Sequence, residues 1–260
     1  MIEEYVTNPE YETYFQKLNG LRPRIAKDLP IEPGMRILDV ATGGAFFALE
    51  VARRDSTLKV TGVEITESGI RDSKKNIRRE GLGDRVKVVE MDATGMNFGP
   101  EEFDTAVNFA GLEDIHMTRG RVGVEKTFHE VARVLKPNGF FCLVVMPPEE
   151  METEAQRIEV ALFSYICDAT WLNAAEYERM LENAGFILVR KETYYTGKKL
   201  TAEQAQAEIR YVCKNDPKIY GITTPPFEQV WAKFGRQIEA NGLGHYSKVV
   251  LMVASKVKGT

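Results

Sequence analysis

Residues 37–45 read Ile-Leu-Asp-Val-Ala-Thr-Gly-Gly-Ala, and this stretch decides the fold. An apolar run of strand length contains one acid, Asp39, and passes into a loop of small residues that opens a helical pattern. Small residues at such a turn let the backbone approach a ligand at the carboxyl end of a strand, beside a helix N-terminus. The stretch therefore predicts a ligand-binding strand–loop–helix unit, although a glycine pair alone is also compatible with a turn that binds nothing.

Short apolar runs and amphipathic segments alternate on both sides of this loop. Strands are expected at 36–40, 59–63, 86–91, 105–109 and 140–146, each rich in Val, Ile, Leu or Phe, as in buried parallel strands. Helical spacing occupies 46–54, 68–80 and 122–135, and the last segment runs into Lys136-Pro137-Asn138-Gly139, a stop-and-turn signal. The alternation predicts a doubly wound α/β sheet.

The flanking segments are expected to be mainly helical. A helical pattern covers 9–29, and a second helix at 173–184 ends at Gly185 and precedes a strand at 186–193. Helices at 202–214 and 226–241 then separate that strand from a final strand at 247–256. We expect one domain, 1–260, with an N-terminal helical segment 1–33, a sheet region 34–197, a helical insert 198–244 and a final strand segment 245–260. The helical insert is expected to form either a lid or the interface of a homodimer.

Composition and charge exclude several classes of protein. Of the 260 residues, 43% are hydrophobic and 28% charged, an ordinary globular composition. The net charge of -4 means that the chain has no excess of positive charge for binding nucleic acid. Cys142, Cys167 and Cys213 are too scattered for a disulfide framework or a metal site, which favours a reducing cytoplasmic location without a bound metal. No apolar run approaches the roughly 20 residues that span a bilayer, and the acidic start does not resemble a secretory signal.

Acidic residues stand at three consecutive strand ends. After Asp39, Glu64 ends the second strand, where a carboxylate can accept hydrogen bonds from ribose hydroxyls. Asp92 follows the third strand, where it can accept from the exocyclic amine of adenine. Any one of these acids alone is compatible with a helix cap or a solvated loop, but the ordered set favours a nucleoside-binding edge.

These residues resemble the class I S-adenosylmethionine-dependent methyltransferases. Residues 37–45 look like the glycine-rich first motif of that family, and residues 103–108 and 132–140 look like its fourth strand and the approach to its fifth. The Leu38–Gly43 stretch is similar to that of quinone-biosynthesis C-methyltransferases. The resemblance implies a Rossmann-like sheet of seven strands, mostly parallel, with an antiparallel last strand and a helical insert before it. It implies cofactor contacts from Asp39, Ala41, Thr42, Gly43, Gly44, Glu64, Ile65, Asp92, Ala93, Asn108 and Phe109.

One departure from the family pattern affects the cofactor loop. The usual glycines would fall on positions 41, 43 and 45, but only Gly43 is retained, with Gly44 beside it and alanine at the other two positions. Ala45 is followed by two large residues, Phe46 and Phe47, which are expected to reduce the space for the methionine part of the cofactor. The binding of the cofactor by this loop therefore has to be measured.

Methyl transfer from a sulfonium requires an oriented nucleophile rather than a catalytic triad. His116, just past the fourth strand, is the candidate proton acceptor, with a loop histidine of no catalytic role as its alternative. The residues after that strand, Asn108 to Gly111, lack the Asn/Asp-Pro-Pro-Tyr pattern that positions a planar amino nitrogen, which disfavours a base amine or glutamine as acceptor. Candidate acceptor-binding aromatics are Tyr11, Tyr14, Phe15, Tyr194 and Tyr195, which ordinary helix packing would also explain.

Three other functions remain open at this point. A cofactor-binding sensor or scaffold would share the same edge without transferring a methyl group. An arsenite methyltransferase would need thiols, which the scattered cysteines supply only loosely. A nicotinamide-dependent oxidoreductase would be expected to show a fuller glycine fingerprint and leaves Asp92 without a role. The leading expectation is transfer to a small, partly apolar metabolite whose acceptor atom, carbon, oxygen, nitrogen or sulfur, is not encoded in any motif.

Overall fold

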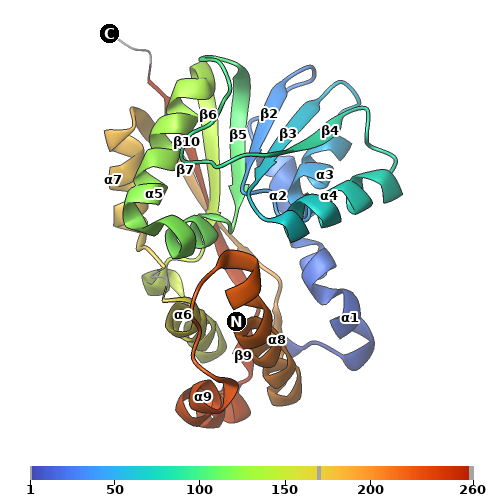
Figure 1. Ribbon diagram of the computed structural model, residues 1–260, viewed down its shortest axis with the longest axis vertical. Helices are drawn as coiled ribbons and strands as arrows, with labels where there is room; N and C mark the ends of the chain where they lie inside the picture. Colours follow the sequence, from blue (N-terminus) through green and yellow to red (C-terminus); the bar gives the residue numbers. More distant parts are fainter. Residues whose placement is uncertain (1, 169–170, 258–260) are drawn as a thin grey trace. The chain divides into compact units, whose positions relative to one another are not determined.

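The computed structural model describes residues 2–168 and 171–257, which form two compact units (Figure 1). The sheet unit comprises 22–145, 174–192 and 250–257. The helical unit comprises 2–21, 146–168, 171–173 and 193–249. The expected terminal segments 1–33 and 245–260 include residues 1 and 258–260, which lie outside the described residues.

Seven strands form the main sheet in the order β4-β3-β2-β5-β6-β10-β7. Strands β2 to β6 pair in parallel, and β10 pairs antiparallel with β6. The strands are β2 (Arg36–Val40), β3 (Lys59–Glu64), β4 (Val86–Glu90), β5 (Phe103–Phe109), β6 (Leu135–Val145), β7 (Phe186–Tyr195) and β10 (Lys248–Lys256). The expected doubly wound, mostly parallel sheet with an antiparallel last strand is confirmed.

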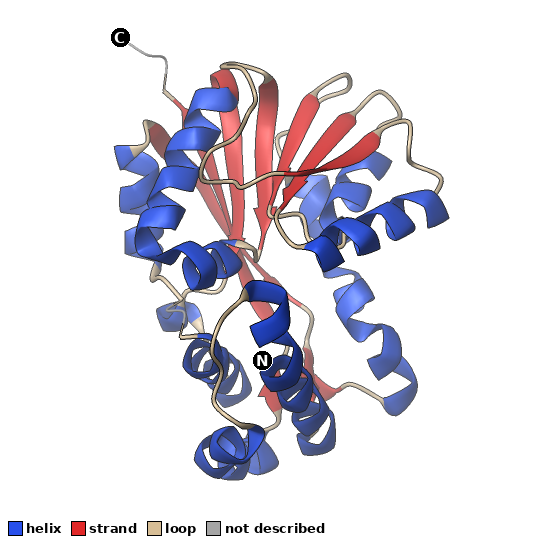
Figure 2. Cartoon of the chain, in the orientation of Figure 1, coloured by secondary structure: helices blue, strands red, loops and turns tan. Residues whose placement is uncertain are grey.

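The strand order also determines where the helices of the sheet unit lie. From β2 the sheet grows one way through β3 and β4 and the other way through β5 and β6, so right-handed crossovers place the connecting helices on opposite faces. Helices α3 (Phe46–Arg53) and α4 (Glu67–Arg79) pack on β3 and β4, whereas α5 (Leu112–Val134) packs on β5 and β6 and against α7 (Ala174–Asn183) (Figures 1 and 2).

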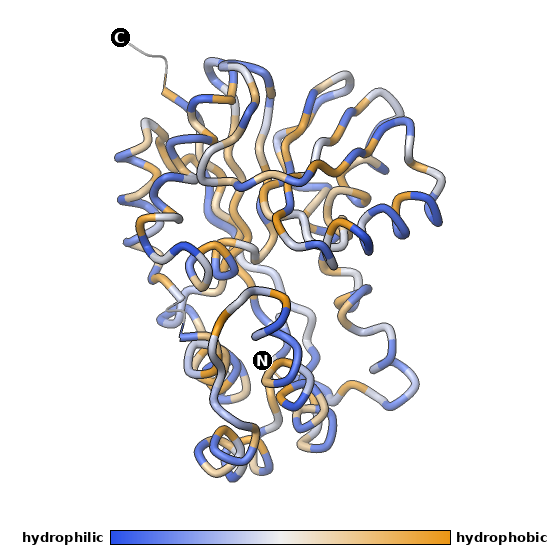
Figure 3. Tube along the Cα trace, in the orientation of Figure 1, coloured by the Kyte–Doolittle hydropathy of each residue, from blue (hydrophilic) through white to orange (hydrophobic). Residues whose placement is uncertain are grey.

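Aromatic side chains fill the core between α5 and the sheet. The ring of Phe141 on β6 lies 5.4 Å from the ring of Phe128 on α5 and 5.8 Å from that of Phe186 on β7. All three side chains are almost completely buried, and the central strands are mainly hydrophobic in Figure 3. Burying such rings stabilises the unit by about 2 to 3 kcal/mol each.

Two strands of the sheet differ from the sequence-based expectation. β4 was expected to be buried, but Lys87 and Glu90 are exposed because this strand is the edge of the sheet. β6 begins at Leu135 rather than at 140, because Phe103 pairs with Leu135 and Thr105 pairs with Phe140. The expected turn at 136–139 is therefore a bulge inside the strand.

Helix α5 begins ten residues earlier than expected. The helix was expected at 122–135, but it starts at Leu112 and contains one break, at Gly120 (φ 66°, ψ -176°). Sequence spacing missed the first segment because glycine at 120 interrupts the apolar repeat. His116 therefore lies on a helix rather than in a loop.

The helical unit contains a second, small sheet and a helix that the sequence analysis did not anticipate. The sheet has the order β1-β8-β9, and the additional helix is α6, which begins with a capping box between Thr153 and Gln156. The elements are β1 (Glu4–Tyr5), α1 (Asn8–Lys17), the short helices η1 (Leu18–Gly20) and η2 (Pro148–Glu150), α6 (Glu154–Cys167), β8 (Lys198–Leu200), α8 (Ala202–Tyr220), α9 (Phe227–Asn241) and β9 (Leu243–Gly244). Helix α9 packs on both α6 and α8.

Two helices outside the core differ in extent from the prediction. The expected helix 9–29 is split, because Leu18 and Asn19 adopt left-handed conformations before α2 (Leu21–Asp28) begins. Helix α8 continues to Tyr220, past the expected end at 214, although it contains Pro217. Pro217 has no N–H to donate to the carbonyl of Cys213. The hydroxyl of Thr224 donates to that carbonyl at 3.1 Å and replaces the missing helical hydrogen bond.

Among residues 2–168 and 171–257, no helix combines the length and the apolar character needed to cross a membrane.

Candidate functional site

The loop between β2 and α3 adopts a backbone that normally favours glycine. Ala41, Gly43 and Ala45 have φ values of 53°, 52° and 61°, all in the left-handed region. The two alanines each cost about 1 to 2 kcal/mol in that conformation. The loop thus retains the shape that three glycines would give, and an ideal Cβ at Gly43 would meet nothing within 4 Å. Gly43 therefore borders open space.

Glu64 holds the loop at the carboxyl end of β3. Its Oε2 accepts from the N–H of Gly43 at 2.9 Å. Its Oε1 accepts from the N–H of Ile65, the N–H of Thr66 and the Thr66 hydroxyl, at 3.0, 2.8 and 2.7 Å. The carboxylate is therefore held in one orientation and keeps acceptor capacity on Oε2. The neighbouring Ile65 is 38% exposed and presents a large apolar side chain.

Asp39 lies near the end of β2, just before the loop, and it is buried rather than exposed. The residue is 1% exposed, and its Oδ2 accepts from the Thr42 hydroxyl at 2.5 Å. Burial raises the pKa of Asp39 to about 7, while the Thr42 hydroxyl and the backbone of Ala48 oppose the shift. This carboxyl therefore organises the loop from within.

Asp92 is placed beside the same edge by the end of β4. The N–H of Met91 donates to the carbonyl of Glu64 at 2.9 Å, which ties the two strand ends together. Asp92 accepts from Thr94 and from Arg119, and it is followed by the buried Ala93. Although burial raises the pKa of Asp92, the hydrogen bonds from these two partners outweigh it and hold the pKa below its ordinary value.

The end of β5 completes the edge. The side-chain amide of Asn108 donates to the carbonyl of Val40 at 2.7 Å, and its oxygen accepts from the N–H of Gly111, so this residue ties β5 to the loop. Phe109 and Phe46 contact the guanidinium of Arg22 at 4.9 and 5.2 Å from their ring centres. Arg22 is only 5% exposed. No local motif marks this arginine, which is why sequence reasoning missed it.

Two ionisable groups follow on the first turns of α5. Glu113 accepts from the hydroxyl of Tyr177 at 3.1 Å, while its Oε2 is buried without a hydrogen-bond partner among the described residues. Burial raises the pKa of Glu113 to about 7, and the Tyr177 hydroxyl opposes the shift. His116, the expected proton acceptor, stands three residues later, which is the spacing of neighbours on one helix face. Glu113 was not anticipated from the sequence.

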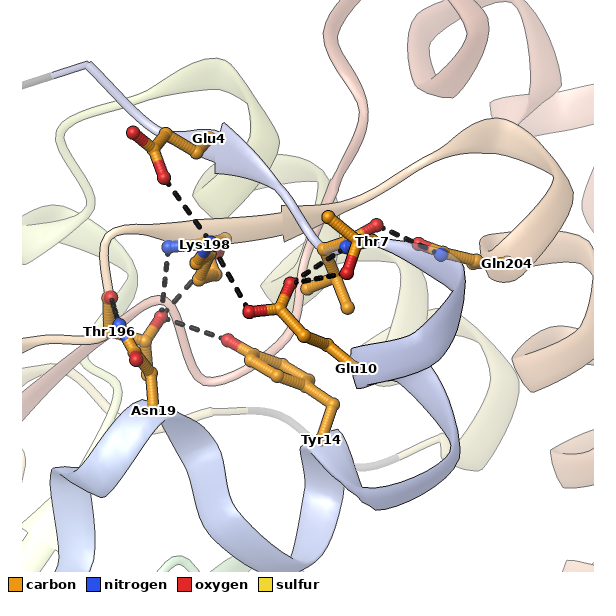
Figure 4. Close-up of polar contacts among 9 residues, drawn as sticks. Glu4, Thr7, Glu10, Tyr14, Asn19, Thr196, Lys198 and Gln204 are labelled. Carbon is orange, nitrogen blue, oxygen red and sulfur yellow. Dashed lines mark hydrogen bonds and ion pairs between the residues drawn. The ribbon is translucent and has the colours of Figure 1, made fainter.

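The expected acceptor-binding aromatics belong to the helical unit. On α1, Tyr14 is buried and donates to the hydroxyl of Thr196 at 3.0 Å, close to the ion pairs of Lys198 with Glu4 and Glu10 (Figure 4). Tyr11 donates to Glu208, and Tyr195 donates to Glu152.

A second histidine also lies among these aromatic rings. Tyr14 and Phe15 lie 5.7 and 5.9 Å from the ring of His245, and the ring of Tyr246 lies 5.2 Å from it. Tyr194 is half-buried at the end of β7. The structure thus groups Tyr14 and Phe15 around His245, while Tyr11 and Tyr195 make separate contacts. His245 was not anticipated, because nothing in its local sequence marks it.

Comparisons with known proteins show a methyltransferase domain. Residues 37–139 match the model of a methyltransferase domain. The chain is 26% identical over 253 residues to 27-O-demethylrifamycin SV methyltransferase of Amycolatopsis mediterranei, covering 95% of this chain and 86% of that protein. It is 36% identical over 120 residues to sterol methyltransferase-like 1 of Botryococcus braunii, a match that spans 46% of this chain but only 29% of that protein.

A solved structure has a similar fold. The [4+2]-cyclase SpnF superposes with a TM-score of 0.65 at 20% identity, over 100% of this chain and 88% of that one. A likeness at this identity shows the fold alone, and its name refers to a cyclase.

Proposed function

Because the chain carries a domain of the class I S-adenosylmethionine-dependent methyltransferases, we propose that it transfers the methyl group of S-adenosylmethionine to a small, partly apolar metabolite. The observation that carries the proposal is the 2.9 Å hydrogen bond between Glu64 and the N–H of Gly43, together with Asp92, which follows the adjacent strand β4. S-Adenosylmethionine supplies a sulfonium methyl group, whose positive charge drives an in-line displacement.

The described residues fit this cofactor. Glu64 would accept from a ribose hydroxyl through Oε2, and Asp92 would accept from the adenine amine. The side chains of Ile65 and Ala93 would flank the base. Open space next to Gly43 supports a ligand at the end of β2 and the loop after it, which comprise Asp39, Ala41, Thr42, Gly43 and Gly44.

The methionyl end of the cofactor would lie toward the end of β5. Arg22, held between Phe46 and Phe109, is the cation that would pair with its carboxylate. Asn108 would act by fixing the loop through Val40. These residues would bind and orient the donor, which is the main requirement of the reaction.

A proton must leave an O–H, N–H, S–H or activated C–H acceptor. His116 is the proposed proton acceptor, and Glu113, with its raised pKa near neutrality, stands on the same helix face. The proposed acceptor-binding residues remain Tyr11, Tyr14, Phe15, Tyr194 and Tyr195. The names of the rifamycin and sterol relatives support an acceptor with extended apolar surface.

Arsenite methylation is the less favoured alternative. Burial raises the pKa of Cys142 to about 12, and burial also raises the pKa of Cys213. A protonated thiol is a poor ligand and a poor nucleophile, because the thiolate is the reactive form.

The experiment that tests the proposal is a transfer assay with S-adenosylmethionine tritiated on the methyl group, incubated with the protein and a metabolite extract. The proposal expects label to move into an organic-extractable product. Binding of the cofactor without any labelled product would favour a sensor or scaffold. Binding of a nicotinamide dinucleotide in place of the adenosyl ligand would favour an oxidoreductase.

A further inference from the structure

Asp92 retains one hydrogen-bonding position at the carboxyl end of β4. Its Oδ1 accepts from the N–H and the hydroxyl of Thr94, at 2.9 and 2.7 Å. Its Oδ2 accepts from Nε of Arg119 at 2.9 Å. Because an ionised carboxylate offers about four acceptor positions, one remains on Oδ2. The side chains of Asp92 and Arg119 are 37% and 43% exposed, so a ligand can reach this pair from solvent.

Two glycines of α5 place Arg119 against Asp92. Gly120 breaks the helix with φ 66° and ψ -176°, a conformation that is open essentially to glycine alone. Gly123 follows, and an ideal Cβ there would lie 2.2 Å from the Cβ of Arg119. No side chain can therefore replace hydrogen at position 123 while Arg119 stays in place. The local sequence Arg-Gly-Arg-Val-Gly, 119–123, thus holds the arginine against Asp92, which follows β4.

The ion pair sets the direction of the remaining acceptor position. Thr94 holds only Oδ1, and without a second partner the carboxylate could rotate about its Cβ–Cγ bond. Arg119 holds Oδ2 as well, so the plane of the carboxylate is fixed. A charge-assisted hydrogen bond to a donor is strong and depends on direction, whereas an acceptor placed at the same point is repelled.

We propose that Arg119 is a specificity-determining residue that positions Asp92 to select an adenine over a 6-oxo purine in the cofactor. This inference rests on the proposed function, because it assumes that an adenosyl ligand binds at this edge. Adenine presents an amino donor at its 6-position, and hypoxanthine presents a carbonyl acceptor there. Arg119 touches neither base in this account and acts through Asp92.

The test is a two-by-two comparison of binding by isothermal titration calorimetry. The ligands are S-adenosylhomocysteine and S-inosylhomocysteine, which differ at the 6-position, and the proteins are wild type and Arg119→Gln. For wild type we expect the adenosyl ligand to bind at least tenfold more tightly. Arg119→Gln should weaken the adenosyl ligand about tenfold and leave the inosyl ligand within twofold, because a lost charge-assisted hydrogen-bond partner costs about one decade of affinity.

A matched control and a second variant separate positioning from a structural effect. Arg121→Gln removes a nearby arginine that pairs with Glu125 and Glu176 instead of Asp92, and it should leave both affinities unchanged. Gly123→Ala displaces Arg119 without changing the charge, and it should reproduce the selective loss.

The possible results separate this inference from the proposed function. If wild type binds neither ligand, the proposed function fails and the inference fails with it. If wild type binds S-adenosylhomocysteine but Arg119→Gln binds it equally well or more tightly, or loses both ligands to the same extent, the role assigned to Arg119 is wrong while the cofactor site stands. Should Arg119→Gln fail to fold, as judged by circular dichroism, the Gly123→Ala variant decides between these results.

Discussion

Replacing Glu64 with glutamine is expected to weaken the binding of S-adenosylhomocysteine on the order of a hundredfold. The amide oxygen of the new side chain must occupy the position of Oε1, because three donors from Ile65 and Thr66 point there. The NH2 group then takes the place of Oε2 and faces the N–H of Gly43, so two donors oppose each other. A hydrogen bond to a charged oxygen contributes about 1.5 to 3 kcal/mol, and losing the bonds to Gly43 and ribose costs roughly 3 kcal/mol.

Isothermal titration calorimetry with S-adenosylhomocysteine measures this loss directly. Glu90→Gln is the matched control, because Glu90 pairs in register with Glu64 on the adjacent strand but is exposed. The control should bind as wild type does, and both variants should show the wild-type circular dichroism spectrum. A Glu64→Gln variant that folds normally and binds within threefold of wild type would refute the reasoning.

Further predictions concern the loop and two buried acids. Gly43→Val should abolish the binding of S-adenosylhomocysteine measured by calorimetry. A β-branched residue is strained at φ 52°, and its side chain would fill the open space beside Gly43. Unchanged binding would show that the loop is not part of the site. Glu159 on α6 is buried, and burial raises its pKa in the folded state from the ordinary 4.5 to about 8, so the stability against urea should fall as pH rises from about 5 to 8. Glu159→Gln should reduce that fall by on the order of 2 kcal/mol, and an unaltered pH profile would contradict the assignment. With the acceptor found in the extract assay, the transfer rate of the wild type should rise with pH through about pH 7, and Glu113→Gln should remove this rise. A rise retained in Glu113→Gln would belong to another group.

The sheet and the loop after β2 could be predicted because their signals are local. Each apolar run is continuous in sequence, and Asp39, Glu64 and Asp92 each stand within or next to one of these runs. The strands that the runs predict are confirmed. The left-handed backbone at Ala41 and Ala45 had no such signal, because alanine normally avoids it. There the surrounding packing overrides the local preference.

The remainder of the candidate site depends on contacts between distant segments. Arg22 reaches Phe109 across 87 positions of sequence (109 minus 22), and Arg119 reaches Asp92 from the far end of a helix segment that the spacing rules did not detect. The small sheet β1-β8-β9 was missed for a related reason. Strands of two or three residues carry no periodicity, and they form only when partners from separate parts of the chain pair.

A crystal structure of the protein grown with S-adenosylhomocysteine would test the central claim most directly. The account predicts electron density for the nucleoside over the ends of β2, β3 and β4, with a ribose hydroxyl on Glu64 and the amino group of adenine on Asp92. Density for the nucleoside at any other place, or crystals from saturating ligand in which Glu64 and Asp92 contact only protein and water, would contradict it.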